Sequence, residues 1–179
     1  MTPDMLERAR RNLAGSDYPQ VEFHKAEIDH LPLPAAFADV VLSNCVINLA
    51  PDKSAVYREM FRILKPGGRI AIADIVLRGD SARMRRIIEQ LPTCGCVSRA
   101  LDENRYLEII GTAGFEGMEI VSERSAMVQT QVQEFAERLK REPGLIEDDL
   151  RELLVGQDPA SWGISAQAVT LVGRRPVQL

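Results

Sequence analysis

The chain has 179 residues, of which 45% are apolar and 27% charged, and its formal net charge is −4. This length fits one domain, and no apolar run reaches the roughly eighteen residues that a membrane-spanning helix needs. The negative charge argues against a nucleic-acid surface, so we expect the arginine-rich runs to be solvated helix faces and no nucleic acid or membrane among the partners. The chain starts without a basic region followed by an apolar stretch, which predicts a cytoplasmic protein with free thiols.

Periodicity and turn residues predict alternating helices and strands. In chain order we expect a helix over 2–15, strands over 21–25 and 38–43, a helix over 51–64, a strand over 69–77, helices near 81–90 and 102–113, a strand near 118–124, a helical stretch over 132–155 and a last strand near 166–174. The strand over 38–43 reads as buried on both faces. This order predicts a single α/β domain over 1–179 with a parallel sheet.

Two groups of glycines have different expected roles. Gly67 and Gly68 follow Lys65-Pro66 and should stop the preceding helix in a turn, because proline fixes φ and glycine accepts positive φ. Gly111, Gly114 and Gly117 are spaced like a dinucleotide-binding fingerprint, but that fingerprint must follow a strand, whereas these follow a helix. We expect them to form a helix cap and turns.

From Met1 to about Val76 the chain resembles class I methyltransferases, and most closely the arsenite methyltransferases. The segments that carry this resemblance are Met1–Leu6, Ala26–Pro32, Ser43–Leu49 with Pro51–Lys53, and Leu64–Arg69. The Leu-Lys-Pro-Gly-Gly segment is shared by many methyltransferases, whereas Ser-Asn-Cys-Val-Ile-Asn-Leu followed by Pro-Asp-Lys is much narrower. A second marker is Cys94–Ser98, followed by a predicted helix and Ala113–Phe115, which resembles the family's substrate-cysteine loop.

The resemblance implies a partial Rossmann-like class I methyltransferase sheet that lacks its first two strands and Gly-rich loop, which would precede Met1. Residues 1–77 would form the core cofactor half and 78–179 the substrate side with the C-terminal strands. The strand over 38–43 would then be an apolar sheet edge, which natural proteins cover or pair. We expect a homodimer to close this edge; the alternative is that the strand over 21–25 moves beside it.

Glu27, Ile28 and Asn44 are the cofactor-binding residues that the resemblance implies for S-adenosylmethionine. The carboxylate at Glu27 would accept a hydrogen bond from the adenine amine, and the Ile28 N–H would meet a ring nitrogen. Asn44 lies just past a strand end, where ligands of open α/β sheets bind. Without the motif around it, Glu27 reads as a solvated loop carboxylate. Loss of two ribose hydrogen bonds with the missing strands would weaken cofactor binding by roughly 10²- to 10⁴-fold.

Cys45 and Cys96 are the catalytic residues that the resemblance implies, with Cys94 as a further arsenic ligand. Trivalent arsenic is thiophilic and brings its own lone pair as nucleophile, so thiolates suit it and no general base is needed. Alternatives remain open: Cys45 as a small buried hydrophobe, two incidental loop thiols, or a zinc site that lacks a fourth ligand. Arg99 stands where the family tends to have a small residue, and is expected to reshape or block this pocket.

The predicted activity is therefore methyl transfer from S-adenosylmethionine to thiolate-bound As(III), with arsenite or thiol-bound arsenic as small-molecule substrate. The alternative is a non-catalytic dimeric remnant of the same fold that binds soft metalloids through its cysteines. A third interpretation is a methyltransferase for a different small molecule.

Overall fold

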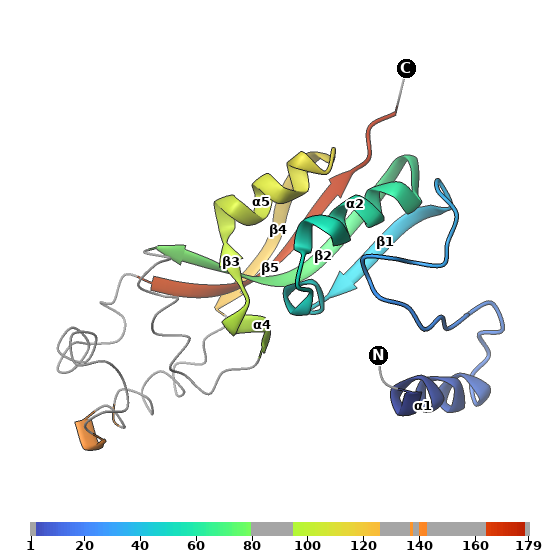
Figure 1. The fold of residues 1–179 in the computed structure, drawn as a ribbon, viewed down its shortest axis with the longest axis horizontal. Coiled ribbons are helices and arrows are strands. Elements are labelled where there is room, and N and C mark those ends of the chain that lie inside the picture. The colour runs from blue at the N-terminus through green and yellow to red at the C-terminus, as the bar shows by residue number, and fades with distance from the viewer. Residues whose placement is uncertain (1–2, 80–94, 126–136, 138–139, 143–163, 178–179) are drawn as a thin grey trace.

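The computed structural model describes residues 3–79, 95–125, 137, 140–142 and 164–177, and within them a five-stranded mixed sheet carries two helices on one face (Figure 1). The elements are α1 (Pro3–Ala14), β1 (Ala38–Asn44), the 3-10 turn η1 (Ile47–Leu49), α2 (Lys53–Ile63), β2 (Leu64–Gly79), α4 (Gly95–Ser98), β3 (Leu101–Asp102), α5 (Glu103–Thr112), β4 (Glu116–Ser125) and β5 (Ile164–Arg174). The α/β prediction is confirmed. None of the described helices is long and apolar enough to cross a membrane.

The long strand β2 is the centre of the sheet, whose order is β1-β2-β5-β4. β1 and β3 both pair with β2 in parallel, on the same edge and one after the other, whereas β5 runs antiparallel along its other edge and β4 pairs antiparallel with β5. The sheet is therefore mixed, and the expectation of a parallel sheet holds only for β1, β2 and β3. The strand β2 is long and extends beyond the end of β1, so β3 can pair with the part of β2 that β1 leaves free.

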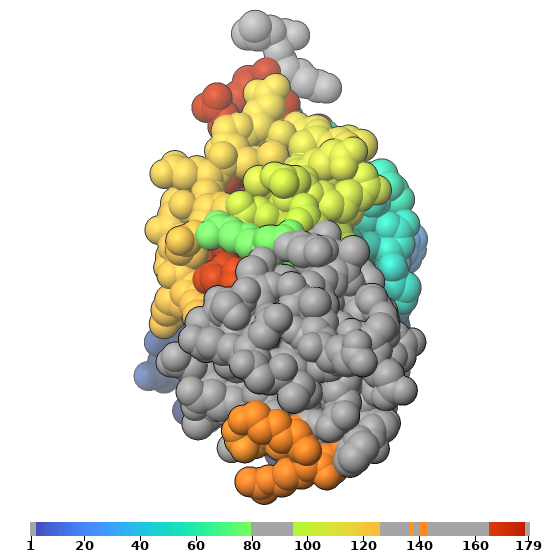
Figure 2. Space-filling model, turned by 90° about the vertical axis from the view of Figure 1, so that its left-hand side faces the viewer, coloured from blue at the N-terminus to red at the C-terminus, as the bar shows by residue number. Residues whose placement is uncertain are grey.

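Helices α2 and α5 lie side by side on one face of the sheet, and Figure 2 shows them next to each other with β4 on the other flank. The main core lies between these helices and the alternate residues Ile70, Ile72 and Val76 of β2. Two edge-to-face aromatic pairs, Tyr57 with Tyr106 and Phe61 with Phe115, join α2 to α5 and the segment after it. Figure 1 shows α1 lying apart from this body.

Strand β1 is exposed, so the prediction that it is buried on both faces is wrong. The side chains of Val40 and Leu42 are 44% and 76% exposed. They pair with Arg69 and Ala71, which places them on the sheet face opposite to α2 and α5. Among the described strands only β2 pairs with β1, so its other edge is free. The predicted role of β1 as an apolar sheet edge is confirmed.

The predicted strand over 21–25 is absent: these residues have no regular structure, and they do not pair with β1. A strand needs a partner for its backbone groups, and this segment does not pair with the free edge of β1 or with any other described strand. The nearest regular feature is an isolated bridge between Glu27 and His30 that closes a tight turn.

Both helices on the sheet begin at a capping aspartate. Asp52 caps α2 by accepting from the Ala55 N–H, and Asp102 caps α5 by accepting from two N–H groups of its first turn. The other predicted elements that fall on described residues are found within a few residues of their expected bounds. The helices expected near 81–90 and over 132–155 lie outside the described residues.

The glycines meet their expected roles only in part. Gly67 and Gly68 lie within β2, after α2 has already ended at Ile63, so they do not form the turn predicted to stop this helix. Gly67 has φ +79°, and the register between β1 and β2 shifts there, so β2 bulges at this point. Gly114 has φ +101° directly after α5, and Gly117 has φ +59° within β4. Gly111 instead lies inside the last turn of α5, and its carbonyl accepts from the Gly114 N–H.

Candidate functional site

Cys45 lies immediately beyond the carboxyl end of β1 in a left-handed conformation, with φ +53°. A non-glycine residue there costs about 1–3 kcal/mol unless its surroundings enforce it. One such restraint is the hydrogen bond from the Cys45 N–H to the carbonyl of Ala73 on β2, at 2.8 Å. Asn44, the last residue of β1, is exposed at the same sheet end. Both predicted residues thus lie where ligands of open α/β sheets bind.

A buried polar cluster on β2 and η1 holds the segment that follows Cys45. The Asn48 side chain donates from Nδ2 to Asp74 Oδ1 at 2.7 Å and to the Ile75 carbonyl at 2.8 Å, and its backbone N–H donates to Asp74 Oδ2 at 3.2 Å. Asn48 is fully buried and Asp74 is 3% exposed. Buried polar groups need such partners, so this cluster fixes η1 against β2.

Two tyrosines extend the cluster toward the helices. Tyr106 of α5 donates its hydroxyl to Asp74 Oδ2 at 3.4 Å, and Tyr57 of α2 donates to the Tyr106 oxygen at 2.7 Å. Burial raises the pKa of both phenols, so they stay neutral donors. Burial also raises the pKa of Asp74, against the opposing effect of its hydrogen bonds and of Lys53. The cluster therefore connects the sheet end to both covering helices.

Cys96 approaches the same region from α4. Cys45 and Cys96 form no disulfide within the described residues. Both are half-buried, and both pack against one small apolar cluster, whose core is Ile75, Leu77, Val97, Ala100 and Ala166. Arg99 joins the two cysteine segments, because its Nη1 donates to the Leu49 carbonyl of η1 at 2.9 Å. Two cysteines far apart in the sequence thus pack against the same apolar cluster. Cys94 lies outside the described residues, which hold no cluster of three metal-ligating side chains.

Glu27 and Ile28 form a tight turn, closed by a 3.1 Å hydrogen bond from the His30 N–H to the Glu27 carbonyl. The Glu27 side chain is exposed and has no hydrogen-bond partner among the described residues, while Ile28 packs against the main core. The Ile28 N–H likewise has no acceptor in the described part of the chain. An open carboxylate acceptor beside an open backbone donor matches the amine and ring nitrogen of an adenine. These residues therefore fit S-adenosylmethionine.

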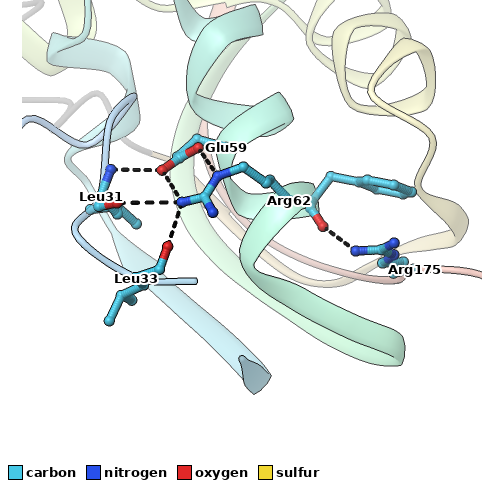
Figure 3. A network of polar contacts seen from close by, with 6 residues as sticks. Leu31, Leu33, Glu59, Arg62 and Arg175 are labelled. Carbon is cyan, nitrogen blue, oxygen red and sulfur yellow. Dashed lines mark hydrogen bonds and ion pairs between the residues drawn. The ribbon is translucent and has the colours of Figure 1, made fainter. Parts of the chain in front are cut away.

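Helix α2 anchors the loop that follows this turn (Figure 3). Glu59 accepts from the Leu31 N–H at 2.6 Å, and Arg62 donates to the carbonyls of Leu33 and Leu31 at 2.8 and 3.3 Å. Arg62 also pairs with Glu59 and lowers the pKa of that carboxyl. On the other side of the same helix, Arg175 stacks on the Phe61 ring and donates to its carbonyl at 2.8 Å. The loop position is thus fixed by a charged pair on α2.

Sequence reasoning missed the residues that hold these segments in place. Asp74 could have been recognised from the sequence as a residue with a special role, because it is the one charged residue inside the apolar run Ile70–Leu77. Asn48 lay within the narrow motif without an assigned role. Glu59 and Arg62 gave no signal, since an i, i+3 charge pair on a helix is usually a solvated face.

The fold and a match to a known family together define the class of protein. A family model for the methyltransferase domain matches residues 1–138, and the chain belongs to this family. With the similarity to curated methyltransferases, this family match identifies the fold as that of the class I S-adenosylmethionine-dependent methyltransferases.

Its similar curated relatives are longer than this chain. The arsenite methyltransferase of Halobacterium salinarum is 42% identical over 122 residues, which are 67% of this chain and 30% of that protein. Methyltransferase GfsG of Streptomyces halstedii is 33% identical over 109 residues, 59% of this chain and 39% of the relative. The chain therefore spans well under half the length of these relatives.

Two solved structures show the same fold. The YcgJ protein of Bacillus subtilis has a TM-score of 0.71 at 15% identity, covering 99% of this chain and 80% of its own. CrArsM, an arsenic(III) S-adenosylmethionine methyltransferase of Chlamydomonas reinhardtii, has a TM-score of 0.65 at 23% identity, covering 98% of this chain and 53% of its own.

Proposed function

We propose that this chain carries the substrate side of an S-adenosylmethionine-dependent methyl transfer to thiolate-bound As(III). The observation that supports it best is the packing of Cys45 and Cys96 against one apolar cluster beside the sheet end. The similarity to the arsenite methyltransferase of Halobacterium salinarum supports the same substrate. Soft thiolates are the ligands that arsenic prefers, and an apolar surround keeps competing water away.

Glu27, Ile28 and Asn44 are the proposed cofactor contacts. When bound, S-adenosylmethionine supplies an electrophilic methyl group. The open Glu27 carboxylate and Ile28 N–H would orient its adenine, with the loop held by Glu59 and Arg62 of α2. Asn44 lies at the same sheet end as Cys45, so it would contact the part of the cofactor nearer the thiols.

Calorimetric titration with S-adenosylmethionine tests the cofactor role. Glu27→Gln should weaken binding about tenfold or more, because it removes a charged acceptor. Glu22→Gln is the matched control, since Glu22 is an exposed carboxylate on the same segment that pairs with His24. Equal affinities for the two variants and the parent chain would contradict the role of Glu27.

Arsenite binding tests the thiol role separately. Cys45→Ser and Cys96→Ser should each lower the affinity for arsenite by at least about tenfold, because each removes one of the two As–S bonds. Ser98→Ala is the control, since its hydroxyl only contacts the Gly95 carbonyl within α4. Arsenite binding that survives both cysteine changes would refute this assignment. The absence of a disulfide at either cysteine among the described residues also suits a reducing, cytoplasmic setting, which we propose for this chain.

We also propose that two copies pair through the free edge of β1. An antiparallel pairing centred on Val41 places Val40 of one copy opposite Leu42 of the other, so the two most exposed apolar side chains of the strand cover each other. Light scattering should give a dimer for the parent chain and a monomer for Leu42→Lys, because a charge at this position blocks the edge. A monomeric parent chain at high concentration would refute the pairing.

A further inference from the structure

We propose that Asp74 is a positioning residue for Cys45: its buried carboxylate holds Asn48, and Asn48 in turn sets the place of the thiol at the sheet end. This inference rests on the proposed role of Cys45 as an arsenic ligand. It concerns two buried residues, Asp74 and Asn48, which act on Cys45 through the backbone of the segment 45–49.

The first step is a gap along one edge of β2. β1 pairs with this edge up to Ala73, and β3 pairs with it from Val76 onward. Between them the chain leaves the sheet at Cys45 and turns through η1. Carbonyls along one edge of a strand alternate, so those of Ala73 and Ile75 face the same way. The Cys45 N–H donates to the Ala73 carbonyl at 2.8 Å, and the Asn48 side chain donates to the Ile75 carbonyl at 2.8 Å.

Asn48 therefore continues the strand pairing across the gap with a side-chain amide. Its donors are all used, on the Ile75 carbonyl and on both oxygens of Asp74. Its Oδ1 is buried without a partner in the described part of the chain. The side chain of Asn48 thus acts only as a donor, and its role is to link the strand carbonyl of Ile75 to the carboxylate of Asp74.

Asp74 is the group that makes this arrangement rigid. It accepts from the side chain and backbone of Asn48, from its own neighbour Ile75 at 2.9 Å, and from Tyr106. Four donors on two oxygens leave the carboxylate no freedom to rotate. Because Asn48 is fully buried and Asp74 is 3% exposed, water cannot replace these contacts.

Cys45 lies between the two attachment points. Two residues, Val46 and Ile47, lie between it and Asn48, and its left-handed backbone persists only while both ends of the segment are fixed. Release of Asn48 would let Cys45 relax to an ordinary conformation and would move its thiol. Cys96 belongs to α4, which reaches the segment 45–49 only indirectly, through the hydrogen bond from Arg99 to the Leu49 carbonyl. Its alkylation rate should therefore change less than that of Cys45, and it serves as a reference within the same molecule.

The test is the rate of alkylation of each cysteine by iodoacetamide in the folded protein, resolved by peptide mass spectrometry. In Asp74→Asn and in Asn48→Ala, the Cys45 rate should rise about tenfold relative to the Cys96 rate, because the half-buried thiol gains freedom. Tyr57→Phe is the matched control: it removes a buried hydroxyl from the same cluster but no donor to Asp74. Its rate ratio should stay within about twofold of the parent chain.

An unchanged ratio in both folded variants would overturn the proposal, as would a parallel rise of both cysteines, which indicates general loosening. If Asp74→Asn does not fold, Tyr106→Phe removes one of the four donors and should shift the ratio in the same direction by a smaller factor. Alkylation needs neither arsenite nor cofactor. A shifted ratio without arsenite binding would therefore refute the proposed function and leave the positioning of Cys45 intact.

Discussion

Arg62 and Glu59 form a two-pronged ion pair on α2, with Nε donating to Oε2 and Nη2 donating to Oε1, both at 2.7 Å. The same Nη2 group donates to the Leu33 carbonyl, and the same carboxylate accepts from the Leu31 N–H. The pair is therefore shared between a helix and a loop. Because Glu27 and Ile28 lie just before this loop, the ion pair fixes the place of the proposed adenine contacts.

Arg62→Ala should release this loop. It leaves the Glu59 carboxylate largely buried with one remaining donor and frees two loop carbonyls, at a cost of about 1–3 kcal/mol in the free energy of unfolding. Urea denaturation measures that cost, and faster hydrogen exchange at the Leu31 amide should report the local release. Affinity for S-adenosylmethionine should fall with it.

Arg105→Ala provides the comparison on α5. Arg105 also pairs with a glutamate at i+3, Glu108, but both side chains are more than half exposed. Such surface pairs contribute about 0–1 kcal/mol, so this variant should be nearly neutral. Equal losses for the two arginine variants would contradict the anchoring role of Arg62.

The same pair should make stability depend on pH. The hydrogen bond and charge of Arg62 lower the pKa of Glu59 below its ordinary value. A lowered native pKa contributes stability that is fully present above the ordinary glutamate pKa and lost as pH falls through the native one. Glu59→Gln lacks a titrating group, so its unfolding free energy should fall less steeply on acidification than that of the parent chain. Parallel curves in urea denaturation across this acidic range would contradict it.

The helices and the central strands could be predicted from the sequence because their signals are local. Asp52 and Asp102 cap helices by contacts within a few residues, and the bulge at Gly67 depends on its own φ. The strand over 21–25 could not be judged in this way. Its sequence is compatible with a strand, but a strand also needs a paired neighbour, and this segment does not pair with the free edge of β1.

The two cysteines of the candidate site could be selected from the sequence, whereas the residues that hold their segments in place could not. Cys45 and Cys96 were identified by chemistry and motif, and their convergence on one apolar cluster follows from the order of the strands. The hydrogen bond between Asn48 and Asp74 joins residues 26 apart in the sequence. No local pattern specifies such a contact, because it depends on η1 crossing the end of β2.

Gly114→Ala should destabilise the protein by about 1–3 kcal/mol. Gly114 has φ +101°, which alanine rarely adopts, and an added Cβ would lie 2.9 Å from Cε2 of the Phe61 ring. Gly111→Ala is the matched control three residues earlier, since it lies within α5 and its Cβ would meet only Met118 Cε at 3.8 Å. That change should be neutral or stabilise by up to about 1 kcal/mol, because alanine favours helix. Thermal unfolding of both variants measures the difference, and a neutral Gly114→Ala would contradict the contact with Phe61.

Asp74 should titrate above the ordinary aspartate pKa. Burial raises its pKa, and the donors from Ile75, Asn48 and Tyr106, with the charge of Lys53, only partly oppose this. Between the ordinary and the native pKa the folded protein keeps a proton that the unfolded chain has lost, so this group lowers stability as pH rises through that window. Carbon-13 NMR of the side-chain carboxyl measures the midpoint directly. Tyr106→Phe should move it further upward, because the carboxylate loses a donor, and a midpoint at or below the ordinary value would show that the hydrogen bonds outweigh burial.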